Sequence, residues 1–157
     1  MSYRDAMATL VEVITAVTPT FDADYPFVFD ENEDGYVRPL EELAGFRHRA
    51  CDFRTTSYPT DDGEAGFTTK RFRTGLELRV LYKAMQDRAW LDRVLGEDIA
   101  LLVNALINPN NYNAAVVSIP PPGSPSVEEI LTNEPNPKAA GWILSIPFDL
   151  IYLSEGP

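Results

Sequence analysis

The strongest candidate for chemistry in this sequence is an acidic segment, DENEDGYVRPLE, at residues 30–41. It fits the calcium-loop pattern D-x-[DN]-x-[DN]-G-x5-E, in which oxygen ligands alternate around a sharp glycine turn. The ligands would be side-chain oxygens of Asp30, Asn32 and Asp34, the carbonyl of Tyr36, and the carboxylate of Glu41. This pattern indicates a possible calcium-dependent binding module.

Other residues in the same region favour an ordinary acidic turn. Pro26 interrupts the helix that should lead into a calcium loop, and Pro39 lies inside the loop itself. The chain has no second copy of the motif to pair with. Asp-Gly and clustered acids are also common turn residues. The calcium site and the acidic turn both remain open interpretations, and we assign no metal ligand.

His48 and Cys51 are the only histidine and the only cysteine. A nucleophile needs a base within hydrogen-bond reach, but residues three apart on a strand point to opposite faces. We therefore expect a partly buried thiol and a surface imidazole rather than a catalytic pair. One of each is also too few for a Cys/His zinc site. Phosphate-binding glycine loops and nucleophile elbows are absent from the sequence, so we expect no catalytic residue, no cofactor and no enzyme.

Composition and charge further limit the class of protein that this sequence can encode. The chain has 157 residues, 45% of them hydrophobic, which is enough for one domain spanning 1–157. No apolar run is long enough to cross a membrane, and the N-terminus does not resemble a signal peptide. The net charge of −11 repels phosphate and disfavours nucleic-acid binding. Residues 22–64 hold 12 of the 24 acids, and the bases Lys70, Arg71 and Arg73 follow directly. Such opposite charges often face a partner subunit.

In the first half of the chain, apolar residues at helical spacing predict a helix over 3–17, with Pro19 ending it. Residues 20–66 form an irregular acidic region, with a short strand at 25–29 and a short helix opening at Pro39. A strand at 46–57 should expose Arg47 and Arg49 on a solvated face.

A second strand at 67–84 should expose Glu77, Arg79 and Lys83 on one face. Residues 46–57 and 67–84 then make a long hairpin whose turn, 58–66, is acidic and lies outside the strands.

In the second half, residues 87–107 predict an amphipathic helix with a break at Gly96, where Glu97 and Asp98 would open a second segment. A short strand at 114–119 and a proline-rich loop at 120–139, with one helical turn at 127–131, come next. The closing strand, 141–153, is apolar on one face and partly apolar on the other. Its second face, or helix 3–17, should be buried between subunits. The fold class is α+β: one mostly antiparallel four-stranded sheet, with helices packed on one face and a long hairpin.

Three segments carry a resemblance to a known family: the strand TGLELRVLYKAM, the helix through LGEDIALLVNALIN, and the closing strand GWILSIPFDLIYLSE after a proline-rich loop. Together with the N-terminal helix, they resemble the tail terminator (tail-completion, minor tail protein U-like) proteins of long-tailed bacteriophages. The resemblance covers roughly residues 1–18 and 70–155 and rests on element order, length and strand character.

The resemblance implies a structural virion protein of the tail or neck, assembled in the host cytoplasm. Such proteins form a homo-hexameric ring that caps the tail tube protein and joins the tail to the head–tail connector or stopper protein. DNA would pass through the lumen without specific binding, and Asp61, Asp62 and Glu64 of the hairpin tip are the candidate lumen acids. One alternative is another head–tail joining, neck or tube protein. The other is the calcium-dependent module at 30–41.

Overall fold

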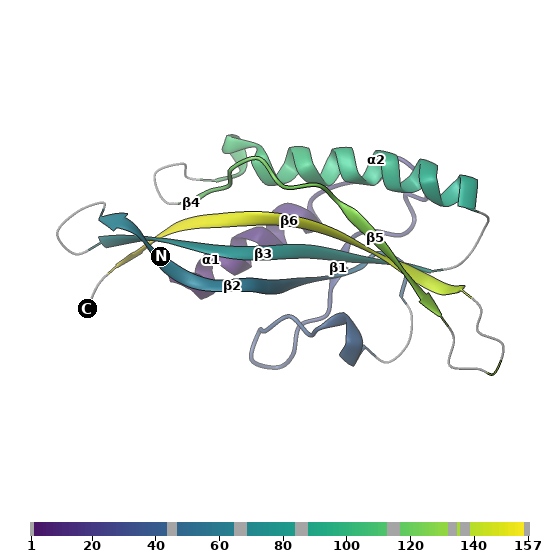
Figure 1. Cartoon of the computed structure of the whole chain (residues 1–157), viewed down its shortest axis with the longest axis horizontal. Coiled ribbons are helices and arrows are strands. Elements are labelled where there is room, and N and C mark those ends of the chain that lie inside the picture. Colours follow the sequence, from purple (N-terminus) through teal and green to yellow (C-terminus); the bar gives the residue numbers. More distant parts are fainter. Residues whose placement is uncertain are drawn as a thin grey trace.

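A computed structural model describes residues 2–43, 47–64, 69–83, 88–112, 117–131, 135 and 139–155. The described part is α+β, with two α-helices and one six-stranded mixed sheet (Figure 1). The α-helices are α1 (Tyr3–Thr15) and α2 (Arg88–Ile107), and two short 3-10 helices are η1 (Leu40–Glu42) and η2 (Pro109–Asn111). The strands are β1 (Val28–Phe29), β2 (Ala50–Glu64), β3 (Thr69–Lys83), β4 (Val117–Ser118), β5 (Ser126–Leu131) and β6 (Ala139–Glu155).

The sheet is built around two strands of matching length. β3 and β6 pair antiparallel without a register shift, from Thr69 opposite Glu155 to Lys83 opposite Gly141. The strand order is β1-β2-β3-β6-β4, and β5 pairs with the other end of β6. The β1–β2 pair is parallel and the remaining pairs are antiparallel. β5 and β4 thus share the same outer edge of β6.

Both α-helices cover one face of this sheet, which we call the helix face. α1 begins with a capping box, in which the Ser2 hydroxyl accepts from the Asp5 amide and the Asp5 carboxylate accepts from the Ser2 amide. Its buried residues join those of α2 and alternate residues of β3 and β6 in one core. The largest fully buried side chains there include Leu10, Ile14, Leu76, Leu78, Tyr82, Leu91, Leu102, Leu106, Leu144 and Ile146.

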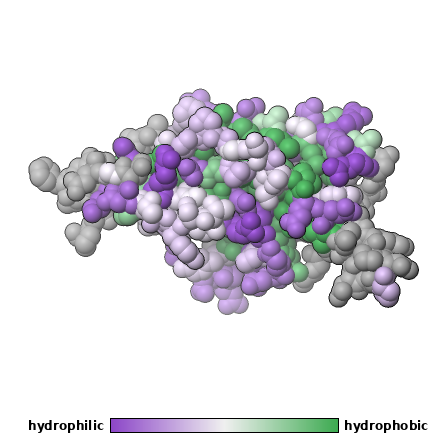
Figure 2. Space-filling view, viewed as in Figure 1, coloured by the Kyte–Doolittle hydropathy of each residue, from purple (hydrophilic) through white to green (hydrophobic). Residues whose placement is uncertain are grey.

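The opposite face of the sheet, which we call the open face, has a smaller apolar cluster. Leu40 of η1 packs there with Ala50 and Leu81, and Ile130 and Ile143 border the cluster. Cross-strand ion pairs occupy much of the remaining face, among them Arg54 with Glu77 and Arg73 with Asp149. In the view of Figure 2, green residues gather to the right of the centre, and purple and white residues cover most of the remaining surface that is drawn in colour.

One end of the sheet extends beyond the helices. There, residues 57–64 of β2, 69–74 of β3 and 150–155 of β6 continue as a ribbon, on the left of Figure 1, which we call the arm. The base of the arm is still covered, because β4 pairs with Ile151 and Tyr152 and the ring of Tyr3 in α1 packs on Tyr152. β2 has register shifts between Thr55 and Ser57, between Ser57 and Thr60, and between Asp61 and Glu64. Bulges of this kind increase the local twist of a strand. Tyr58 on the arm is 83% exposed.

The α+β class and most element positions agree with the sequence, but the four-stranded sheet was wrong. Residues 126–131 form strand β5, not a helical turn, since they pair with β6 along its outer edge. The hairpin turn at 58–66 was also placed too early. β2 continues to Glu64 because β3 supplies backbone partners for it, down to Lys70 opposite Glu64. Residues 65–68 lie outside the described part.

The predicted break at Gly96 does not occur, because α2 runs without interruption from Arg88 to Ile107. Tertiary packing of the stripe through Leu91, Leu95 and Leu102 outweighs the weak helix propensity of one glycine. The short strand expected at 25–29 is confirmed at Val28–Phe29, and the short helix after Pro39 is the 3-10 helix η1. No helix in the described ranges is long and apolar enough to span a bilayer.

Candidate functional site

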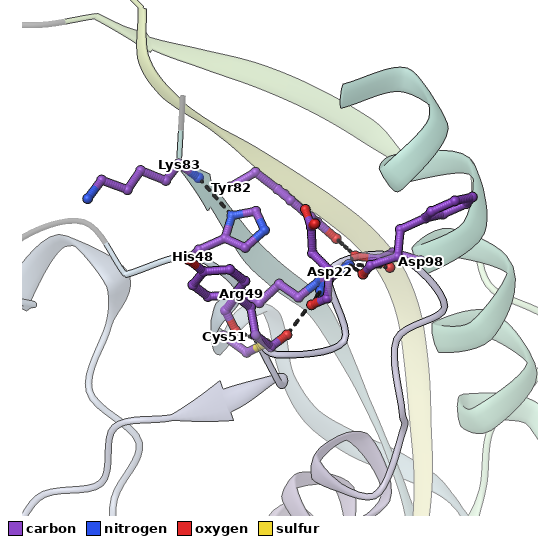
Figure 3. Close-up of polar contacts among 9 residues, drawn as sticks. Asp22, His48, Arg49, Cys51, Tyr82, Lys83 and Asp98 are labelled. Atoms are coloured by element: carbon purple, nitrogen blue, oxygen red, sulfur yellow. Dashed lines mark hydrogen bonds and ion pairs between the residues drawn. The ribbon is translucent and has the colours of Figure 1, made fainter. Parts of the chain in front are cut away.

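The most concentrated group of polar side chains lies between α2 and the segment before β2. Arg49, whose side chain is fully buried, donates from Nε and Nη2 to the two carboxylate oxygens of Asp98, at 2.9 and 3.0 Å. Its remaining donors reach the carbonyls of Phe21, Asp22 and Tyr25, at 2.6 to 3.0 Å. Figure 3 shows the guanidinium lying between the Asp22 segment and α2. All five N–H groups of the arginine are therefore satisfied.

Tyr82 of β3 completes this network, since its hydroxyl donates to Asp98 Oδ2 at 2.6 Å. Burial raises the pKa of Asp98, while the hydrogen bonds from Arg49 and Tyr82 act in the opposite direction. Burial also raises the pKa of Tyr82, and the neighbouring Asp98 charge adds to this effect. A buried ion pair in which every arginine donor is satisfied and both carboxylate oxygens accept hydrogen bonds fixes the geometry around it. We interpret the network as an anchor that fixes residues 21–25 against α2.

The prediction that Arg49 lies on a solvated strand face was wrong. Arg49 lies in the turn before β2 with φ of +61°, and its side chain turns inward to Asp98. Arg47 is exposed, as expected. One signal pointed to Asp98: it is spaced as Leu91, Val94, Leu95 and Leu102 are, so it lies within the apolar stripe of α2. An acid in such a stripe requires a buried partner.

His48 and Cys51 are both buried, so the expected surface imidazole was wrong. The His48 ring packs against Tyr25, Tyr82 and Trp90, and its Nδ1 accepts from the Lys83 amide at 3.2 Å. Burial, with the nearby Arg49 charge, lowers the pKa of His48 to about 4. Burial raises the pKa of the Cys51 thiol, which donates to the Arg49 carbonyl. A neutral, buried thiol is a poor nucleophile.

A second polar network lies on the open face around Arg79, which was expected to be solvated but is buried. Its guanidinium donates to both oxygens of Asp52 and to both oxygens of Glu41. The hydrogen bonds from Arg79 lower the pKa of Glu41 to about 2. Asp52 also accepts from the Leu40 amide at 2.9 Å. This network attaches η1 to the sheet and accounts for the burial of a charge in the middle of β3.

The acidic segment forms a hairpin, residues 30–38, which we call the acidic hairpin. Glu31 bridges to Val37, and Asn32 Oδ1 accepts from the amides of Asp34 and Tyr36. Gly35 has φ of +80°, as a sharp turn requires.

Glu41, the proposed closing ligand of the calcium loop, is bound to Arg79 instead. Within the described ranges, no three acidic, histidine or cysteine side chains gather as a metal site.

Further exposed charges lie on the arm and on the acidic hairpin. On the open face, Arg73 pairs with Asp149 at 3.1 Å, while on the helix face Lys70 lies 3.7 Å from Asp61. Arg71 is exposed on the open face, opposite Leu153 of β6. The side chains of Asp62 and Glu64, the other proposed lumen acids, lie outside the described part. No protein-family model matches this chain, and no curated protein matches it either.

Proposed function

We propose that the protein is a structural virion component that caps the tail tube of a long-tailed bacteriophage as an oligomeric ring and joins the tail to the head connector. The observation that carries this proposal is the arm. Where the sheet continues past its covering helices, it exposes side chains on its faces, and the outer edge of β2 there has no strand partner among the described residues, which suits contact with neighbouring subunits. A protein that acts through assembly needs such a surface more than it needs a cleft.

The placement of the polar side chains supports the same interpretation. Arg49, Asp98 and Arg79 are buried and used in ion pairs that attach the acidic N-terminal region to the sheet. These ion pairs fix the part of the described fold outside the arm, which we call the body, and make it a rigid platform for the arm. The net charge of −11 suits a ring around DNA, because an acidic lumen repels the phosphate backbone and lets it slide.

Tube assembly provides a direct test. Tail tube subunits that polymerise in the presence of the purified protein should give tubes of limited length, with extra density at one end in negative-stain electron micrographs. Bovine serum albumin at equal concentration is the control. Tubes of unchanged length with bare ends would contradict the proposal, and density at the connector instead would favour another neck position.

A further inference from the structure

On the open face of the arm, Arg71 lacks, among the described residues, the acidic partner that other arginines of this face have. Along this face, Arg79 pairs with Asp52 and Glu41, Arg54 pairs with Glu77 at 2.6 Å, and Arg73 pairs with Asp149. Arg71 is exposed and, within the described residues, has no hydrogen bond, ion pair or ring contact. It lies opposite Leu153, and both Leu153 and Ile151 are only half-buried on the same face. The arm therefore presents a positive charge beside apolar surface.

The acidic hairpin has the complementary chemistry. Glu31, Glu33 and Asp34 are exposed, and their carboxylates have no partner among the described residues. Tyr36 beside them is 60% exposed, although it lies at the end of a well-ordered turn. Tyrosine is common at the centre of protein interfaces, because it offers a large apolar ring with a polar end.

The acidic hairpin is also held in place before any partner arrives. Arg4 of α1 donates to the Asp34 carbonyl at 3.0 Å, and its guanidinium lies 5.8 Å from the centre of the Tyr36 ring. The Asn32 side chain and the Glu31–Val37 bridge fix the turn from within. A surface that is already ordered loses little conformational entropy on binding.

We propose that the arm of one copy docks on the acidic hairpin of the next copy, with Arg71 facing Glu31 and Glu33 and with Ile151 and Leu153 against Tyr36. The occupant of the arm's open face is thus a second copy of this chain. The two surfaces are different, so the contact is head-to-tail and closes into a ring when the rotation allows. This inference rests on the proposed ring-forming function and assigns the residues of its subunit interface.

Charge reversal tests this contact by sedimentation velocity, over a range of protein and salt concentrations. Arg71→Glu and Glu33→Arg should each weaken self-association at least about tenfold, because each places like charges across the interface. An equimolar mixture of the two variants should recover assembly, because alternating copies restore opposite charges. Both positions are exposed, so the free energy of unfolding, measured by urea denaturation, should stay within about 0.5 kcal/mol of the wild-type value.

Two variants with the same charge change serve as controls. Lys83→Glu changes an exposed cation at the other end of β3, and Glu128→Arg changes an exposed acid on β5. Neither should alter self-association by more than about twofold, since both lie away from the arm and the acidic hairpin.

Each outcome is decisive for the contact. A wild-type ring that Arg71→Glu and Glu33→Arg affect no more than the controls overturns the inference and leaves the proposed function standing. If the wild-type protein is monomeric alone but caps tubes, the fraction of capped tube ends is measured for the same variants. Capping that Arg71→Glu and Glu33→Arg leave unchanged overturns the proposed contact. A wild type that neither self-associates nor binds tubes overturns both proposals.

Discussion

Arg49 in the body and Arg71 on the arm show two uses of the same residue type. Arg49 is fully buried and directs its donors to Asp98 and three backbone carbonyls, whereas Arg71 is exposed with no described partner. Burying a guanidinium is tolerable only where every donor is satisfied, so Arg49 defines one arrangement of the chain around it. An exposed, unpaired arginine contributes little to folding and is available for a partner. Internal polar contacts thus fix the structure of the body, whereas the arm has exposed side chains that are available for a partner.

The largest expected effect tests the buried side of this comparison. Asp98→Ala leaves the charge of Arg49 buried without its carboxylate, and should destabilise the protein by about 3–5 kcal/mol. Urea denaturation measures the change. Asp92→Ala on the same helix is the matched control, because its pair with Arg88 is exposed and should cost less than about 1 kcal/mol. Equal losses for the two variants would show that Arg49 is not an anchor.

The next effect is a pH dependence that arises from the body alone. The unfolded chain protonates His48 near pH 6.5, whereas the folded protein does so only near pH 4. The stability due to the neutral imidazole is therefore complete above pH 6.5 and is lost as pH falls towards 4, by roughly 1–3 kcal/mol. Urea midpoints of the wild type and His48→Gln, measured from pH 7 to pH 4, should converge at the acid end. Parallel curves would contradict the burial of this ring.

A smaller change in stability, of opposite sign, is expected when Gly96 and Gly75 are each replaced by alanine. A Cβ at Gly96 would meet nothing within 4 Å, so Gly96→Ala should stabilise the uninterrupted helix α2 by about 0.5–1 kcal/mol. A Cβ at Gly75, where the arm joins the body, would lie 2.6 Å from the hydroxyl oxygens of Ser57 and Thr56. Gly75→Ala should therefore destabilise the protein. Thermal denaturation of both variants measures the signs, and a destabilising Gly96→Ala would indicate a break in α2 after all.

The smallest effect on folding is expected on the arm itself. Tyr58→Ala removes a side chain that is 83% exposed, so the free energy of unfolding should change by less than about 0.5 kcal/mol. Phe53→Ala on the same strand is the comparison, because that ring stacks on Phe29 at 5.2 Å and packs against the main core. A similar loss for both variants in urea denaturation would mean that the arm is part of the folding core.

Elements with a strong period could be predicted from the sequence, and those that depend on distant partners could not. Helices α1 and α2 and strand β6 repeat apolar residues at regular spacing, which local patterning reveals. β5 was missed because SVEEIL offers little alternation, and its strand form depends on pairing with β6. The burial of Arg49 depends on Asp98, which is far away in the chain and was itself predicted to open a second helical segment after Gly96. The sequence shows that Arg71 is charged, but it does not show where the residue lies in the fold.

We propose that this protein assembles through exposed surfaces into a ring that caps a tail tube. Sedimentation velocity of the purified protein, alone and mixed with isolated tail tubes that lack their cap, tests it most directly. We expect a ring near six copies or co-sedimentation of the protein with tube ends. A protein that remains monomeric at all concentrations and leaves the tubes unbound would contradict it.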